Sequence, residues 1–429
     1  MPLKKLVAAT LRFLAHDEAH RELRTRKRRP ADQAAFERSV ETVVCNLAYA
    51  VVMPPENGRL AILTGNQLRG RSRYENHKAL GSKPFRHLLH QLEHVQFLEF
   101  NPSPGRGESS SVKPTPWFVR KVQEHGVALA HFGRDTNEEV ILLNRAKSTG
   151  PKPDQALSQR ERVNYKDTAE THAFRDEIRR LNAFLAAADI DFVDDGLQPR
   201  VDPYRRSLRR YFTILPGQKV RFDQNGRLFG GFWLEMRSER RAGIRMNGEP
   251  CVTLDYSAMF TRLAYAHLKV TPPPGDPYAI EGAEGYRSGI KLAMNTFLFD
   301  THNRRRRWPS AMGVGVGSDA DAEADPHSLA AQYERRLPAG WTVAVTRKAI
   351  LKKHPALADA WGQSLGYHLM FVESRVLLAA LHKLMAKNIP ALGLHDGLMV
   401  QASKREEARR AMVEAAREIT GAELPVSDK

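Results

Sequence analysis

The chain contains the stretch Val252-Thr253-Leu254-Asp255-Tyr256-Ser257, in which a short apolar strand pattern runs into an aspartate. A second stretch, Leu394-His395-Asp396-Gly397, stands between two apolar runs. An Asp-Gly pair in that setting predicts a β-hairpin with the aspartate at its tip. Two carboxylates at strand ends can hold a pair of hard cations such as Mg²⁺, about 3.5–4 Å apart, around a phosphoryl group. Purely structural interpretations are a helix N-cap for Asp255 and a turn for Asp396.

The residues between the two aspartates predict a helix with a cationic face. Arg287, Lys291, Asn295 and Phe299 recur every four residues. This spacing advances about 40° per step around a helix, so the four side chains share one broad face. Two cations one turn apart, followed by an amide and an aromatic ring, suit a nucleotide bound phosphate first. The alternative is a solvated basic face, which the apolar neighbours of these residues disfavour.

The charge balance points to a polyanionic partner. The 429 residues include 66 Lys and Arg against 49 Asp and Glu, a net charge of +17. Such a field attracts nucleic acid, and a basic surface without a ligand is the alternative. Candidate contacts are two basic clusters, Arg209 with Arg210 and Arg304 with Arg305 and Arg306.

The cysteines and the hydropathy bound the class of protein. Cys45 and Cys251 are the only cysteines, which excludes a disulfide framework and a cysteine-based zinc site. No stretch approaches the roughly 18 uninterrupted apolar residues that span a membrane. We therefore expect a protein of the reducing cytoplasm that does not contact a membrane.

Periodicity and loop signals predict four parts of the chain. Residues 1–135 predict helices, a strand at 59–63, helices at 67–80 and 83–94, and strands at 95–100 and 116–122 around a Pro/Gly/Ser-rich loop. This order is typical of a winged-helix DNA-binding module, with a plain α/β packing module as the alternative. Residues 136–167 predict a linker and residues 168–220 a helical, thumb-like segment. Residues 221–429 hold the motifs above and end in helices at 365–387 and 404–419.

The motifs of residues 221–429 resemble the polymerase core of family A DNA polymerases and phage-type single-subunit RNA polymerases. Val252–Ser257 resembles the first palm motif, whose aspartate holds both metals, and Leu394–Gly397 resembles the third. Arg287-x3-Lys291 resembles the fingers helix that grips the incoming triphosphate. Asp223-x2-Gly226-Arg227 resembles an upstream motif that touches the primer–template, although the pattern alone is more typical of a plain β-turn.

The resemblance implies an α+β fold: a right-hand palm with an antiparallel sheet, and helical fingers at about 276–350. It implies two Mg²⁺ ions, replaceable by Mn²⁺, held by Asp255, Asp396 and the Tyr256 backbone. Arg287 and Lys291 then act on the triphosphate as catalytic groups. The implied nucleotide pocket contains Asn295, Phe299, Phe260, Tyr256 and Tyr278. Arg227 and His395 are expected to support the primer and the template.

Departures from the family pattern bear on substrate choice. Phe260 stands where DNA polymerases place a glutamate that excludes the ribose 2′-hydroxyl, and a bulky ring there favours dNTPs by sterics. Asp223 is the form seen more in the RNA polymerases, and Gly397 removes a third acidic residue. No proofreading exonuclease is expected before the core. The leading hypothesis is a DNA polymerase, associated with a mobile element or phage, that uses a DNA template, a primer and nucleoside triphosphates. The alternatives are an RNA polymerase or primase on the same fold, and a catalytically inactive DNA-binding replication initiator or regulator.

Overall fold

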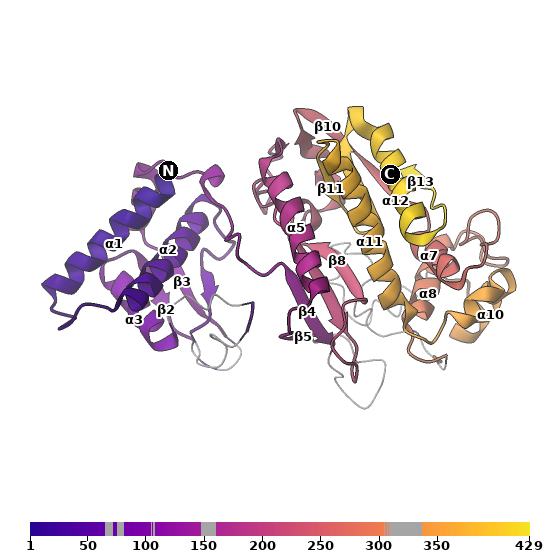
Figure 1. The fold of residues 1–429 in the computed structure, drawn as a ribbon, viewed down its shortest axis with the longest axis horizontal. Helices are drawn as coiled ribbons and strands as arrows, with labels where there is room; N and C mark the ends of the chain where they lie inside the picture. Colours follow the sequence, from indigo (N-terminus) through magenta and orange to yellow (C-terminus); the bar gives the residue numbers. More distant parts are fainter. Residues whose placement is uncertain are drawn as a thin grey trace. The chain divides into compact units, whose positions relative to one another are not determined.

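The protein forms two compact units, which are described separately (Figure 1). The computed structural model describes residues 1–64, 72–74, 81–103, 105, 108–146, 160–303, 305–306, 308 and 337–429. Unit 1 comprises Met1–Glu139 and Gly196–Arg205, and unit 2 comprises Val140–Asp195 and Arg206–Lys429. Within these described ranges, no helix combines the length and the apolar character needed to cross a bilayer.

Unit 1 packs helices against a small antiparallel sheet. Its helices are α1 (Pro2–His20), α2 (Pro30–Val52), α3 (Ser82–His94) and α4 (Pro116–Glu124), and its strands are β1 (Leu60–Ile62), β2 (Leu98–Asn101) and β3 (Ser110–Pro114). The sheet order is β1-β3-β2, with Phe100 opposite Val112. One apolar core joins all of these elements and includes the fully buried Leu14, Leu89 and Phe118. The predicted helix at 67–80 lies almost entirely outside the described residues.

One strand prediction in unit 1 is wrong. Residues 116–122, expected to be a strand, form the start of helix α4, and the second strand of the hairpin is Ser110–Pro114. Local chemistry explains the difference. The Thr115 hydroxyl accepts a hydrogen bond from Phe118 N, and Pro116 occupies the first helical position. A threonine cap followed by proline starts a helix, whatever the β propensity of the residues that follow.

Unit 2 contains two sheets and most of the helices of the chain. Its strands are β4 (Ile141–Ala146), β5 (Arg160–Arg162), β6 (Ile190–Phe192), β7 (Arg209–Ile214), β8 (Asn225–Phe229), β9 (Ile244–Met246), β10 (Glu249–Tyr256), β11 (Ala391–Gly393), β12 (Gly397–Gln401) and β13 (Val426–Asp428). Its α-helices are α5 (Ala169–Ala187), α6 (Phe232–Glu235), α7 (Met259–Leu268), α8 (Arg287–Phe299), α10 (Val343–Lys353), α11 (Leu365–Ala386) and α12 (Arg405–Thr420). Helices with mainly antiparallel strands agree with the expected α+β class.

The first sheet of unit 2 has the order β5-β4-β7-β8, and only the β4–β7 pair is parallel. Residues 136–167, predicted as a linker, supply β4 and β5, and residues 168–220, predicted as helical, add β6 and β7 to helix α5. The run Val140-Ile141-Leu142-Leu143 is buried because β4 is an inner strand. A short apolar run that is buried on both faces has no alternating pattern, so periodicity does not reveal it.

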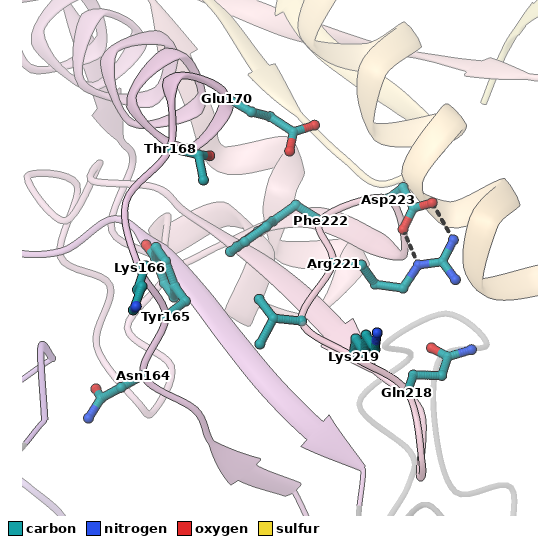
Figure 2. Close-up of a pocket in the computed structure, with 11 residues that line it drawn as sticks. Asn164, Tyr165, Lys166, Thr168, Glu170, Gln218, Lys219, Arg221, Phe222 and Asp223 are labelled. Carbon is teal, nitrogen blue, oxygen red and sulfur yellow. Dashed lines mark hydrogen bonds and ion pairs between the residues drawn. The ribbon is translucent and has the colours of Figure 1, made fainter.

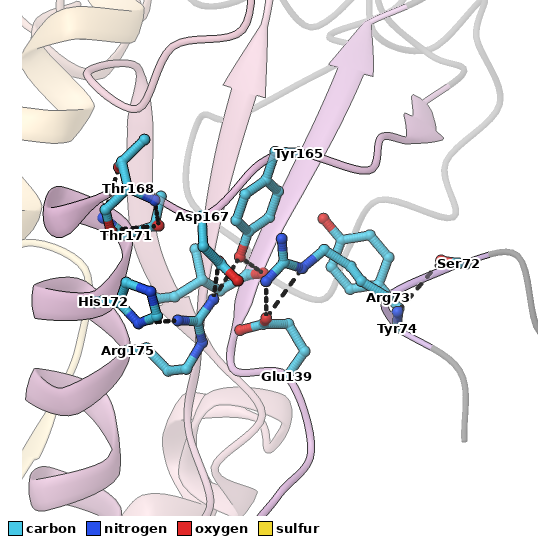
Figure 3. A network of polar contacts seen from close by, with 11 residues as sticks. Ser72, Arg73, Tyr74, Glu139, Tyr165, Asp167, Thr168, Thr171, His172 and Arg175 are labelled. Carbon is cyan, nitrogen blue, oxygen red and sulfur yellow. Dashed lines mark hydrogen bonds and ion pairs between the residues drawn. The ribbon is translucent and has the colours of Figure 1, made fainter. Parts of the chain in front are cut away.

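A polar network fixes the start of α5 (Figure 3). Thr168 N donates to Thr171 Oγ1 over 2.8 Å, and Thr171 N donates back to Thr168 Oγ1 over 3.2 Å. One turn later, Arg175 forms a 2.7 Å ion pair with Asp167. This reciprocal cap satisfies amide groups that a helix start otherwise leaves without partners. Helix α5 begins at Ala169, within one residue of the predicted start of the helical segment at 168.

The second sheet has the order β11-β12-β10-β9-β6, and β13 also pairs with β10. Helices α11 and α12 pack side by side against it (Figure 1). The Tyr256 hydroxyl donates a 2.7 Å hydrogen bond to the Met412 carbonyl of α12. Both helices lie within one residue of their predicted bounds.

Candidate active site

The fold brings the two predicted aspartates side by side. Asp255 stands opposite Gly397 in the antiparallel pairing of β10 with β12. Tyr256 N donates a 2.9 Å hydrogen bond to the Asp396 carbonyl, and Leu394 N donates a 2.8 Å bond to the Gly397 carbonyl across the turn. The predicted hairpin is present, but His395 and Asp396 form its tip, and Gly397 already belongs to β12.

Gly397 is required by the closeness of the two strands. A Cβ at this position would overlap Asp255 Oδ1 and the Leu254 carbonyl oxygen. The backbone conformation of Gly397 is an ordinary one, so space and not a left-handed turn selects glycine. A third carboxylate directly after Asp396 has no room in this arrangement.

The Asp255 carboxyl is held in an electrostatically unusual environment. Its side chain is 15% exposed, and Oδ1 is buried with no hydrogen-bond partner in the structure. Burial raises the pKa of Asp255, and the negative charge of Asp396 raises it further. The positive charges of Lys429 and Lys291 oppose these effects. A bound cation would offset the repulsion between the two carboxylates and would give Asp255 Oδ1 a partner.

The cationic helix acts on the carboxylates through Lys291, whose positive charge lowers the pKa of Asp255. Lys291 of α8 is exposed, whereas Asn295 is buried and its Oδ1 has no hydrogen-bond partner. Arg287, at the first position of α8, pairs with Asp276 at 2.6 Å, and its guanidinium lies 5.0 Å from the Tyr278 ring centroid. Arg287 and Lys291 therefore present two cations, one helical turn apart.

An aromatic cluster closes the far end of α8. The Phe299 ring lies 5.9 Å from that of Phe260 and 5.1 Å from that of Tyr367 on α11. Gly366 lets the Phe299 ring lie against the α11 backbone, since a Cβ there would stand 2.7 Å from the ring. Phe260 also lies 5.5 Å from the Arg227 guanidinium. The ring expected to act on the sugar is thus held between an aromatic and a cationic neighbour.

The two predicted tyrosines take different places. Tyr278 is buried, its hydroxyl accepts a 3.4 Å hydrogen bond from Thr261, and burial raises its pKa. The Tyr256 ring points to α12, because successive side chains of β10 alternate between faces and Asp255 occupies the other one. The prediction that the Tyr256 ring lines a sugar pocket is therefore wrong, while its backbone remains next to Asp396.

Sequence reasoning missed a buried ion pair beneath the hairpin. Glu373 of α11 is 1% exposed, and its Oε2 receives a 2.6 Å hydrogen bond from Arg227 Nε. Glu373 Oε1 is buried without a hydrogen-bond partner. Burial raises the pKa of Glu373 to about 7, and the Asp396 charge adds to this effect. No local pattern marks Glu373, since it is one of several polar residues on α11 and stands directly before Ser374 and Arg375.

His395 completes this cluster. Its ring lies 5.3 Å from that of Phe229 at a tilt of 57°, and burial with the neighbouring Arg227 charge lowers its pKa to about 4. At neutral pH the imidazole is therefore uncharged. Arg227 is buried, and His395 is half-buried and uncharged, so neither offers a free charge at the surface.

The predicted basic clusters differ in accessibility. Arg210 is 1% exposed and binds Glu177 at 3.0 Å, the Gly226 carbonyl at 3.0 Å and the Ser374 hydroxyl at 3.2 Å. It joins β7, β8 and α11, so the prediction that it contacts nucleic acid is wrong. Arg209 is half-buried on the opposite face of β7, Arg305 pairs with Asp300, and Arg306 is exposed. Arg304 lies outside the described residues.

The donor set fits the expected magnesium ions. Two carboxylates and a neighbouring backbone carbonyl are the hard oxygen ligands that Mg²⁺ prefers, with water completing the coordination. The partnerless Asp255 Oδ1 is an oxygen available to such an ion. Across the part of the chain that the structure describes, no third His, Cys, Asp or Glu joins them to make a larger metal cluster.

A separate hollow lies at the other end of β8 (Figure 2). It has a volume of about 960 Å³ and is open to solvent. Its lining comes from the segment before and within the first turn of α5 and from the loop before β8: Asn164, Tyr165, Lys166, Thr168, Glu170, Gln218, Lys219, Val220, Arg221, Phe222 and Asp223. His395 contacts the last residue of β8, whereas this hollow ends before its first. It is therefore not part of the carboxylate site.

No family model matches the sequence, and no curated protein matches it. Among solved structures, the chain is similar to the POL domain of Pol1 from M. smegmatis in complex with DNA primer-template and dNTP, at 12% identity and a TM-score of 0.26. The match covers 93% of this chain and 65% of that one, so the chain spans less than two thirds of it. A likeness at this score carries no argument about fold or activity.

Proposed function

We propose that the chain is a template-directed nucleotidyltransferase, and specifically a DNA polymerase without proofreading. The observation that carries the proposal is the juxtaposition of Asp255 with Asp396, beside the Lys291 charge. A carboxylate couple that faces a cationic helix matches the needs of phosphoryl transfer, in which positioning and charge stabilisation supply most of the catalysis.

Each group of the site has a task in this proposal. Asp255, Asp396 and the Tyr256 carbonyl hold two Mg²⁺ ions, or Mn²⁺ in their place. When bound, these ions supply positive charge to the attacking and leaving oxygens of an in-line displacement. Lys291 and Arg287 bind the triphosphate, and Arg287 exchanges its exposed Asp276 partner for the phosphate oxygens. Tyr278 supports Arg287 through its ring.

The remaining residues orient the sugar, the base and the primer. Phe260 excludes a 2′-hydroxyl by its bulk, and Phe299 with Asn295 contacts the sugar and base. The buried Arg227 and neutral His395 hold the hairpin under the primer terminus. Arg305 and Arg306 lie near the backbone of the nucleic acid.

Unit 1 is proposed to be a winged-helix DNA-binding module. Its sheet order β1-β3-β2, with α3 immediately before the β2–β3 hairpin, supports this proposal. The solvent-facing side of α3 carries Lys83, Arg86, His87 and His90. A DNA-binding front end next to a polymerase is consistent with replication of a mobile element or phage.

Primer extension by the full chain tests the proposal. Asp255→Asn and Asp396→Asn are expected to abolish Mg²⁺-dependent incorporation while leaving DNA affinity, measured by fluorescence anisotropy, unchanged. Asp176→Asn, at an exposed position on α5, is the control and should be active. Incorporation near the wild-type level by either site variant would overturn the assignment.

The same assay separates the alternatives. Extension with NTPs and without a primer would identify an RNA polymerase or primase. Absence of incorporation with every nucleotide set, together with tight DNA binding, would identify an inactive replication initiator or regulator.

A further inference from the structure

The segment that follows α12 covers one edge of β10 beside Asp255. Strand β13 pairs antiparallel with β10 and places Ser427 opposite Asp255. Ser257 N donates to the Pro425 carbonyl over 2.8 Å, and Lys429 N donates to the Thr253 carbonyl over 3.1 Å. The pairing therefore continues past Asp255 on both sides and fixes the backbone of Lys429.

Helix α12 holds this strand through hydrogen bonds from Arg409. Arg409 donates a 2.6 Å hydrogen bond to the Val426 carbonyl and a 3.0 Å bond to Asp428. Side chains two positions apart on a strand point to the same face, so Thr253 and Asp255 share one face of β10. Lys429 lies opposite Thr253 and therefore projects its side chain to that face. The position of the ammonium group thus follows from the pairing of the strands.

The Lys429 ammonium lies at the carboxylate couple. Its Nζ is 3.0 Å from Asp255 Oδ2, and the charge of Asp396 attracts it as well. Its side chain is 64% exposed, so it can leave the carboxylate without losing buried contacts. Asp255 Oδ1, on the other side of the same carboxyl, has no partner. One oxygen of the carboxyl is thus taken by an internal cation and the other is free.

We propose that Lys429 is a positioning residue of the metal site, whose ammonium occupies Asp255 Oδ2 in the metal-free protein and competes there with the divalent cation. This inference rests on the proposed metal site. A single positive charge offsets part of the repulsion between two carboxylates and keeps Asp255 oriented. A divalent ion must displace that charge or bind against its repulsion. Lys429 thereby sets the cation concentration at which the site fills.

Direct metal binding tests this competition without reference to catalysis. Free Mn²⁺ is measured by electron paramagnetic resonance during titration of the full chain. Lys429→Met is expected to lower the Mn²⁺ dissociation constant by roughly threefold to tenfold, because one opposing charge is lost near the surface. Lys429→Arg retains the charge and should bind Mn²⁺ as the wild type does. An unchanged or raised dissociation constant for Lys429→Met would overturn the inference.

Two controls make the outcomes distinct. Lys383 is the matched lysine, because it also bridges two carboxylates, Glu418 at 3.0 Å and Glu414 at 3.8 Å, and Lys383→Met should leave Mn²⁺ binding unchanged. Thermal unfolding verifies that each variant is folded, and Lys429→Gln replaces Lys429→Met if the latter is not. If Asp255→Asn abolishes Mn²⁺ binding but Lys429→Met does not tighten it, only this inference fails. If Asp255→Asn leaves Mn²⁺ binding intact, the metal site, the proposed function and this inference fail together.

Discussion

Gly397 lies directly opposite Asp255 in the pairing of β10 with β12, and no side-chain atom fits between them. The two catalytic candidates therefore depend on a residue that has no functional group of its own. The space between the strands decides how close the carboxylates come.

Gly397→Ala is expected to reduce incorporation by roughly 100-fold, because a shift of about 1 Å at a reacting centre has that effect. The added methyl group must push Asp255 or its strand away from Asp396. Gly393→Ala, on the same hairpin, is the control, since its Cβ would meet only the flexible Leu381 and Leu377 side chains at 3.1 and 3.2 Å. Primer-extension rates check both variants. Equal rates for Gly397→Ala and the wild type would show that the strand spacing is not critical.

Arg227→Met should destabilise the fold by about 3–5 kcal/mol, since it leaves the Glu373 carboxylate buried without its cation. The double variant Arg227→Met with Glu373→Met removes both charges and should be less destabilised than Arg227→Met alone. Urea unfolding followed by circular dichroism measures the free energies. Additive losses in the double variant would contradict a direct coupling of the two side chains.

Glu373 also predicts a pH dependence. Burial raises its pKa from the ordinary 4.5 to about 7, so the folded protein retains a proton that the unfolded chain has lost. The free energy of unfolding should therefore fall as the pH rises from about 4.5 to about 7 and show no further contribution above that range. Glu373→Gln should remove this slope, whereas the exposed control Glu414→Gln should retain it. A difference between Glu373→Gln and wild type that is constant from pH 5 to pH 8 would contradict the prediction.

Phe260→Ala is expected to raise the use of ribonucleotides relative to deoxynucleotides by roughly tenfold to hundredfold, because the bulk that excludes the 2′-hydroxyl is lost. Phe260→Leu retains most of that bulk and should still discriminate. The ratio of kcat/KM for each nucleotide pair measures the effect. Discrimination that survives Phe260→Ala would place the sugar selection elsewhere.

Lys83→Ala and Arg86→Ala on α3 should each weaken duplex DNA binding. Each should also lower the slope of log affinity against log salt concentration by the amount that about one phosphate contact contributes. Lys121→Ala on α4 is the control, because Lys121 already pairs with Glu124 at 2.6 Å. Anisotropy titrations at several salt concentrations provide the slopes. Identical slopes for the α3 variants and the wild type would exclude α3 from the interface.

Features with a local cause were predictable from the sequence. The bounds of α5, α11 and α12 follow from apolar periodicity, helped at the start of α5 by the Thr168 cap, and the hairpin at Asp396 follows from its turn residues. The strand patterns place Asp255 and Asp396 at strand ends, and the resemblance to the palm motifs implies that the two approach each other. The role of the couple stays a prediction.

Features that depend on distant partners were not predictable. Arginine is usually found at the surface, yet Arg210 is buried, because Glu177, Gly226 and Ser374 on three other elements bind its guanidinium. Arg227 is buried through its ion pair with Glu373. The Lys429 ammonium reaches Asp255 because β13 pairs with β10, and no sequence motif predicts this pairing. In each case a charge is neutralised by a residue far away in the sequence, which periodicity does not detect.

Helix α11 has a further mechanical consequence. A 22-residue helix is about 33 Å long and stiff. Its first turn lies against Phe299, its middle carries Glu373, and Leu377 and Leu381 approach the hairpin strand at Gly393. No loop interrupts this path, so one rigid element joins the aromatic end to the hairpin that bears Asp396. In the proposed function, the groups that contact the base and the groups that hold the metal ions are therefore both anchored on α11.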